Sequence, residues 1–98
     1  DYPGVSPLHC FLKDTKRARY TAASDEDALE AYKLVTKYEN LKPSLEPSHA
    51  FSIAIKESRK LSKETIVIVN SCGDAHKDKA ILKKRLGKKY AKFNWSCI

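Results

Sequence analysis

The sequence predicts an α/β fold in which two central helices lie around a short parallel sheet of about two strands. Apolar residues recur at helical spacing over residues 25–40 and again over 49–62. A continuous apolar run over 65–70 has the length and β-branched composition of an inner strand. These patterns predict a small, partial three-layer-like domain, with a basic helix added at the C-terminus. Two strands are too few to be stable alone, so the apolar faces need a partner.

The first 23 residues predict loops and one short strand. Two prolines and a glycine within residues 1–9 favour an extended loop with turns. A short helical turn is expected next. Residues 17–23 are then expected to form the second strand of the sheet.

The stretch SDEDALEAYKLVTKYEN predicts the first central helix. Ser24 is a favourable N-cap, and Asp27 stands at the capping-box position. Acidic residues in the first turn suit the positive end of the helix dipole. Asn40 can end the helix. The predicted apolar face consists of Ala28, Leu29, Ala31, Tyr32, Val35 and Tyr38.

The second central helix and the inner strand follow a segment with two prolines. Ser48 is the predicted N-cap of a helix over residues 49–62, whose first two turns are largely apolar. The strand over 65–70 then runs into a polar turn that contains Gly73. Strands that end in such a turn often deliver it to a ligand.

Residues 78–93 predict a basic amphipathic helix. Leu82, Leu86, Tyr90 and Phe93 lie on one stripe of it, at spacings of four, four and three. Gly87 weakens this helix by about 1 kcal/mol relative to alanine. The chain is accordingly divided into a domain over 1–78 and a basic tail over 79–98.

The charge of the chain is concentrated in its second half. Residues 50–98 carry 12 basic and 4 acidic side chains, whereas residues 1–49 are nearly neutral. This excess favours an acidic partner: nucleic acid, an anionic membrane or an acidic protein surface. The alternative is a solvated tail with no partner. No apolar run approaches the ~20 residues that a transmembrane helix needs.

The cysteines favour a reducing compartment. Their number is odd, and no CxxC spacing occurs among Cys10, Cys72 and Cys97. Only Cys72 and His76 are spaced like metal ligands, so a zinc site is not expected. Reduced thiols indicate an intracellular location, with a plastid or mitochondrion among the compartments left open.

Four stretches together resemble one family. In order, they read DYPGVSPLH, DEDALEAY, KPSLEPSHA and IVIVNSCGDAHKD. They are similar, in sequence and spacing, to the last quarter of the tryptophan synthase β chain, a pyridoxal-phosphate enzyme of fold type II. The resemblance covers residues 1–78 almost without a gap, and the remaining residues fit only loosely.

The resemblance implies site roles for particular residues. A carboxylate that meets the substrate and another beside the cofactor ring would be Asp1 and Glu46. Backbone carbonyls that bind a monovalent cation would come from Tyr2 and Gly4. The edge of the pyridoxal-phosphate site would be formed by Asn70, Cys72 and Gly73, where Cys72 replaces a serine that meets the pyridine nitrogen. Without the resemblance, Glu46 is simply a solvated carboxylate between two prolines.

The chain also departs from the family. Asp74 replaces an arginine, Ala75 a glycine and His76 an aspartate in the turn after the strand. The Schiff-base lysine and the glycine-rich phosphate loop lie upstream of this region in the family, and this chain holds no equivalent. Catalysis by these 98 residues alone is therefore not expected, and no cofactor is expected on the chain in isolation.

Three functions remain open, and the first is slightly favoured. The first is a non-catalytic scaffold or linker that docks into a larger assembly. The second is a fragment or subunit of a tryptophan synthase β-type enzyme, completed by a complementary chain. The third is nucleic-acid binding through the basic tail. The residues expected to bind a partner are Lys83, Lys84, Arg85, Lys88, Lys89, Tyr90, Phe93 and Trp95.

Overall fold

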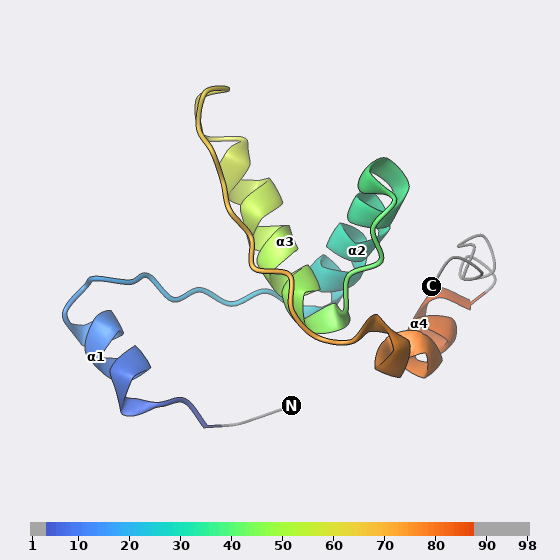
Figure 1. Ribbon diagram of the computed structural model, residues 1–98, viewed down its shortest axis with the longest axis horizontal. Coiled ribbons are helices and arrows are strands. Elements are labelled where there is room, and N and C mark those ends of the chain that lie inside the picture. The colour runs from blue at the N-terminus through green and yellow to red at the C-terminus, as the bar shows by residue number, and fades with distance from the viewer. Residues whose placement is uncertain (1–3, 88–98) are drawn as a thin grey trace.

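A computed structural model of the chain describes residues 4–87. Within this range, helices and extended segments alternate, and α2 and α3 form a V at the centre (Figure 1). The elements are α1 (Pro7–Asp14), α2 (Asp25–Glu39), α3 (Leu45–Ser58), the 3-10 turn η1 (Ala75–Asp78) and α4 (Lys79–Leu86).

The predicted α/β fold class is wrong. Residues 4–87 contain four α-helices and no β-strand. Residues 17–18 lie in the turn after α1, where both amides donate to the Leu12 carbonyl. Residues 19–23 and 65–70 are extended, but they line one groove over α3 and do not pair with each other. A strand needs the backbone of a neighbour for its hydrogen bonds, and the described part of the chain supplies none beside these segments. Without those hydrogen bonds, neither segment becomes part of a parallel sheet.

Helix α2 confirms the first predicted helix and its capping box. The amide of Asp27 donates to Ser24 Oγ at 3.1 Å, and Asp27 Oδ2 accepts from the Ser24 amide at 3.2 Å. Asn40 ends the helix in the left-handed conformation, with φ of 53°. Most of the predicted apolar face is buried, but Tyr38 near the C-terminal end is exposed.

The N-cap of helix α3 lies four residues before the predicted cap. Its N-cap position is Ser44, and Pro47 lies in the first turn, where the missing N–H leaves no helical hydrogen bond unmade. Ser48 is instead a buried helical residue, whose hydroxyl donates to the Ser44 carbonyl at 2.7 Å. The helix ends at Ser58, short of the predicted end.

Helix α1 lies apart from the other helices (Figure 1). The sequence predicts a loop and a short turn here, but a helix of two turns starts at Pro7, a favourable first helical position. None of its residues is buried. A hydrogen bond of 2.8 Å between His9 Nδ1 and the Tyr20 hydroxyl joins it to the extended segment that follows.

The apolar core lies between α2 and α4. Tyr32 and Leu82 are fully buried, and Leu86 joins them; Leu29 and Leu45 pack against this cluster. The predicted stripe is thus confirmed for its first two members. Helix α4 ends at Leu86, and the rest of the predicted helix and stripe, including Tyr90 and Phe93, lies outside the described residues.

Candidate functional site

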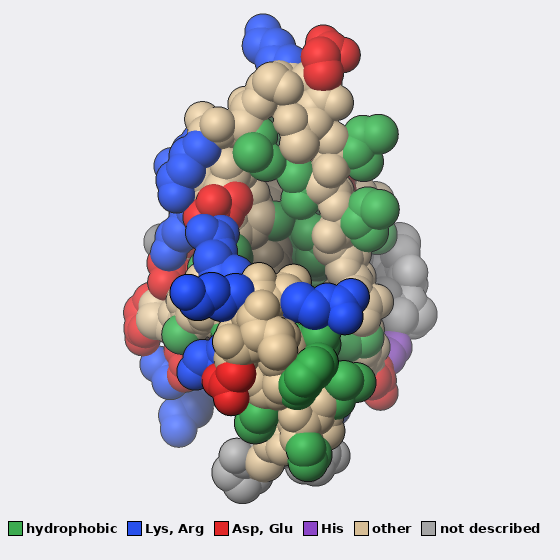
Figure 2. Space-filling view, turned by 90° about the vertical axis from the view of Figure 1, so that its left-hand side faces the viewer, with side chains coloured by type: hydrophobic (Ala, Val, Ile, Leu, Met, Phe, Trp, Pro, Cys, Tyr) green, Lys and Arg blue, Asp and Glu red, His purple; other side chains and the backbone are tan. Residues whose placement is uncertain are grey.

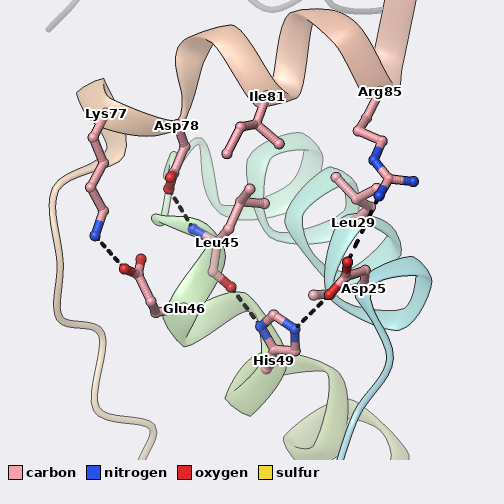
Figure 3. Close-up of a pocket in the computed structure, with 10 residues that line it drawn as sticks. Asp25, Leu29, Leu45, Glu46, His49, Lys77, Asp78, Ile81 and Arg85 are labelled. Atoms are coloured by element: carbon pink, nitrogen blue, oxygen red, sulfur yellow. Dashed lines mark hydrogen bonds and ion pairs between the residues drawn. The ribbon is translucent and has the colours of Figure 1, made fainter. Parts of the chain in front are cut away.

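The N-terminus of α3 is bound to the turn at 72–78 through consecutive residues. Ser44 Oγ donates to the Cys72 carbonyl at 3.0 Å. The Leu45 amide donates to Oδ2 of the buried Asp78 at 2.7 Å, which satisfies one of the free N–H groups of the helix (Figure 3). This connects chain segments about thirty residues apart.

Glu46 adds an ion pair with Lys77 to these contacts (Figure 3). We refer to the whole set of contacts as the α3 junction, formed by Ser44, Leu45 and Glu46 with Cys72, Lys77 and Asp78. Each residue of the helix terminus thus holds a different residue of the turn. The turn is fixed by a hydrogen bond to its backbone, a hydrogen bond to its aspartate and a charge contact.

The junction holds Glu46 as an anion. The Lys77 ammonium lowers the pKa of Glu46 from 4.5 to about 2, assisted by hydrogen bonds from the Glu46 amide and the Ser44 hydroxyl, while burial opposes this. Such a carboxylate is almost never protonated near neutral pH. Chemically it is a fixed negative charge and a hydrogen-bond acceptor, and a poor proton donor.

The turn strongly favours glycine at position 73. Its φ is +88°, and a Cβ atom there would lie 2.4 Å from Ser44 Oγ. The same Cβ position is 3.3 Å from Glu46 Oε2. Cys72 is exposed and not in a disulfide. The structure therefore brings Glu46, Cys72 and Gly73 together at the α3 junction, and their role at a cofactor stays a prediction.

Two hollows adjoin the junction. One, of about 700 Å³, lies between the N-terminal parts of α2 and α3 and the η1–α4 segment. The other, of about 620 Å³, is a groove between α3 and the extended segments around Tyr20 and Val67. Glu46 and His49 line both hollows, and Asn70 lines the groove with them.

A second set of polar and charged groups crosses the first hollow (Figure 3). His49 Nδ1 donates to the Leu45 carbonyl at 2.9 Å, and its Nε2 lies 3.5 Å from Asp25 Oδ1. Arg85 lies 3.8 Å from the other oxygen of Asp25 and 4.0 Å from Glu26. Arg85, predicted to bind a partner, thus already contacts acidic groups of its own chain.

The altered turn residue Asp74 has a local role. Its Oδ1 accepts from the His76 amide at 2.8 Å and so caps η1. An arginine, which the resemblance implies at this position, could not accept this hydrogen bond, because a guanidinium only donates. Asp74 therefore stabilises the backbone of this turn.

The other predicted site residues are not gathered at the junction. Gly4 is exposed and lines neither hollow. Lys83 and Lys84 are exposed on α4. Outside the described residues lie Asp1, Tyr2, Lys88, Lys89, Tyr90, Phe93 and Trp95. The monovalent-cation site and the partner-binding surface stay predictions. No group of His, Cys, Asp or Glu within residues 4–87 is arranged to hold a metal ion.

Sequence reasoning missed Ser44, Lys77 and Asp78. The signal for Ser44 was available: a serine three residues before a proline fits an N-cap followed by a first helical turn. Nothing in the local sequence marks the other two, because their partners are distant in the chain.

Among the described residues, no helix is both long and apolar enough to cross a bilayer.

The chain matches known proteins over most of its length, although no family model matches it. It is 46% identical over 89 residues to a tryptophan synthase β chain of Fusobacterium nucleatum, covering 91% of this chain and 22% of the relative. It is 49% identical over 78 residues to that of Vesicomyosocius okutanii, covering 80% and 20%. For the Allorhizobium ampelinum protein the values are 44% over 87 residues, 89% and 21%.

The chain corresponds to a segment of these larger relatives and spans about a fifth of their length. All three relatives are tryptophan synthase β chains. The chain is related to the C-terminal part of the tryptophan synthase β chain, and the resemblance noted in the sequence is confirmed.

Proposed function

We propose that the chain forms the C-terminal wall of the active site in a tryptophan synthase β-type enzyme that uses pyridoxal phosphate. The site is complete only when the remainder of such an enzyme is present. The observation that carries this proposal is the α3 junction, where Glu46 lies beside the Cys72–Gly73 turn. The 44–49% identity over most of the chain supports it further.

The turn suits the edge of a cofactor. The Cys72 thiol is exposed while its carbonyl is held by Ser44, so the backbone is fixed and the side chain is available. A thiol is a weak hydrogen-bond donor that leaves a pyridine nitrogen unprotonated. When bound, pyridoxal phosphate supplies the electron sink for exchange of a β-substituent on an amino acid. Glu46 would add a fixed negative charge beside it.

The exposed segment over residues 65–70 supports the proposal that the rest of the enzyme is needed. Ile66 is 86% exposed and Ile68 is 89% exposed. Neighbouring hydrophobic side chains are gathered on the same face, over α3 and this segment (Figure 2). Apolar side chains on a stretch of this kind are normally covered in the assembled protein. The segment leads directly to the Cys72–Gly73 turn, so a partner that covers it would also adjoin the site.

Complementation tests the proposal. The 98-residue chain is mixed with a relative's β chain truncated before the matching segment, and pyridoxal phosphate is added. We expect a protein-bound cofactor absorbance and formation of tryptophan from serine and indole only when both parts are present. Substituting Cys72→Ala should weaken the response, Cys72→Ser should retain it, and Cys10→Ala serves as the matched control on α1. Stable association without bound cofactor would contradict the proposal.

That contradicting outcome would favour a non-catalytic scaffold. The replacement of a site arginine by Asp74, now a cap of η1, favours this second candidate. Docking would then use the exposed lysines of α4, Lys83 and Lys84, against an acidic protein surface. Reversing both charges should abolish association under the scaffold hypothesis. Nucleic-acid binding through the same lysines would instead be shown by a steep loss of affinity with salt.

A further inference from the structure

The two oxygens of the Glu46 carboxylate face different parts of the turn. Oε1 forms the ion pair with Lys77. Oε2 lies on the side of Gly73, 3.3 Å from the point where a Cβ atom would stand. Together with hydrogen bonds from the Glu46 amide and the Ser44 hydroxyl, Lys77 therefore sets the orientation of the carboxylate, with Oε1 on the lysine and Oε2 beside the turn.

Lys77 is itself held in place by its neighbours in the chain. Asp78, the next residue, is buried and binds the Leu45 amide, and Asp74 caps the turn that carries Lys77. The lysine thus reaches Glu46 from an anchored backbone. This differs from an ordinary surface ion pair, in which two long side chains must both be ordered from mobile supports.

The other charged groups around this hollow are engaged differently. Its ionisable lining consists of Asp25, Glu46, His49, Lys77, Asp78 and Arg85. Arg85 and His49 both approach Asp25. Asp78 binds a backbone amide. Lys77 is therefore the cation assigned to Glu46 within the described part of the chain.

We propose that Lys77 is a positioning residue for Glu46: it holds the carboxylate charged and directed toward the Cys72–Gly73 turn. The importance of this contact for the enzyme rests on the proposed function, which assigns Glu46 to the cofactor site. The contact itself belongs to the chain and is measurable without cofactor. Lys77 touches no reacting group and acts through Glu46.

The test is a carboxyl titration of the 98-residue chain by NMR with ¹³C-labelled glutamate. The Glu46 resonance is assigned by its loss in Glu46→Gln. In the unaltered chain, we expect a pKa of about 2. In Lys77→Met, it should rise toward the ordinary value of 4.5. In Lys77→Arg it should stay low, and in Lys84→Met, the matched exposed lysine of α4, it should not change.

An unchanged Glu46 pKa in Lys77→Met would overturn the proposal. Helix content by circular dichroism checks that this variant is folded. If it is not, the unaltered chain is titrated with and without about 1 M salt, which shortens electrostatic range to about 3 Å. Because both partners are partly exposed, salt should raise the Glu46 pKa; no response would likewise overturn the proposal.

The titration separates this inference from the proposed function. If complementation fails but the Glu46 pKa rises in Lys77→Met, the enzyme assignment is removed and the positioning contact remains. Successful complementation with no pKa response would do the reverse. When both succeed, Lys77→Met should also reduce activity of the complemented enzyme, and Lys77→Arg should restore most of it.

Discussion

The α2–α4 core and the extended segment at 65–70 differ in how completely they are folded. Tyr32 and Leu82 are fully buried, although they come from elements far apart in the sequence. Ile66 and Ile68 belong to the most apolar run of the chain, yet they are among its most exposed side chains. Hydrophobicity alone therefore does not decide burial here. Within residues 4–87, the difference is whether another element packs against each side chain.

The described structure is less compact than an independent domain of its size. Its radius of gyration is 15.2 Å, whereas an independent domain of 100 residues has about 13 Å. The core side contains its own partners. Within residues 4–87, no such cover lies over Ile66 and Ile68, and the chain spans about a fifth of the relatives it matches.

The largest effect is expected from truncating the core. Leu82→Ala should lower the free energy of unfolding by about 2–5 kcal/mol, because the side chain is fully buried between α2 and α4. Its neighbour provides the control: Ile81→Ala, at a half-exposed side chain, should cost less than about 1 kcal/mol. Urea unfolding followed by circular dichroism measures both. Equal losses would mean that the core is no better packed than the surface.

A somewhat smaller loss is expected at the turn. Gly73→Ala should lower the free energy of unfolding by about 1–3 kcal/mol, since it combines a positive φ with a clash against Ser44. Gly4→Ala, where no atom lies within 4 Å, is the matched control and should be nearly neutral. Unfolding midpoints in urea compare them. A tolerated alanine at 73 would show that the turn is not held against α3.

Removing the aspartate cap should cost about 1 kcal/mol. Asp78→Ala leaves the Leu45 amide without its acceptor at the start of α3, as in other losses of an N-terminal cap. Asp78→Asn, which keeps an oxygen acceptor, should recover most of this loss. Thermal unfolding of the two variants gives the comparison. If both behave like the unaltered chain, the α3 junction contributes nothing to stability.

Acid should lower the free energy of unfolding through two carboxylates, Asp27 and Glu46. The pKa of Asp27 falls from 3.8 to about 2, chiefly through the Lys56 ammonium, and that of Glu46 from 4.5 to about 2. Folded-state pKa values below the unfolded ones stabilise the fold above about pH 4.5. This contribution is lost as the pH falls from 4.5 toward 2. Urea unfolding across this range should show the decline, and Lys56→Met should flatten part of it.

The smallest effect on stability is expected in the extended segment. Ile68→Lys should change the free energy of unfolding by less than about 0.5 kcal/mol, because the side chain is 89% exposed. The same substitution should strongly weaken association with the truncated β chain, measured by calorimetry. Lys37→Glu, at an exposed position in the last turn of α2, is the control. Retained association would mean that another surface meets the remainder.

The sequence predicts those elements whose determinants are local. The helix over α2 is confirmed with its cap, Ser24, and its end, Asn40, because each acts within a few residues. The start of α3 is wrong by four residues, because Ser48 and Ser44 are both plausible caps and the contacts to Cys72 and Asp78 decide between them. The sheet is wrong because a strand requires a neighbour, and sequence pattern alone does not supply one.

The sequence also predicts only part of the candidate site, because some of its contacts join distant residues. Glu46, Cys72 and Gly73 come from the family resemblance, and the structure brings them together. The ion pair of Glu46 with Lys77 joins positions 31 residues apart, so no local sequence pattern predicts it. That contact also makes Glu46 a poor proton donor, because a carboxylate with a pKa of about 2 stays ionised.

The exposed run at 66–69 has a consequence for how the chain is handled. Four successive β-branched residues without charge or proline form a segment of the kind that stacks into intermolecular cross-β aggregates. Lys63 and Glu64, just before it, are its nearest charged gatekeepers. The chain alone should therefore lose solubility as its concentration rises, and synthesis together with its complement should protect it.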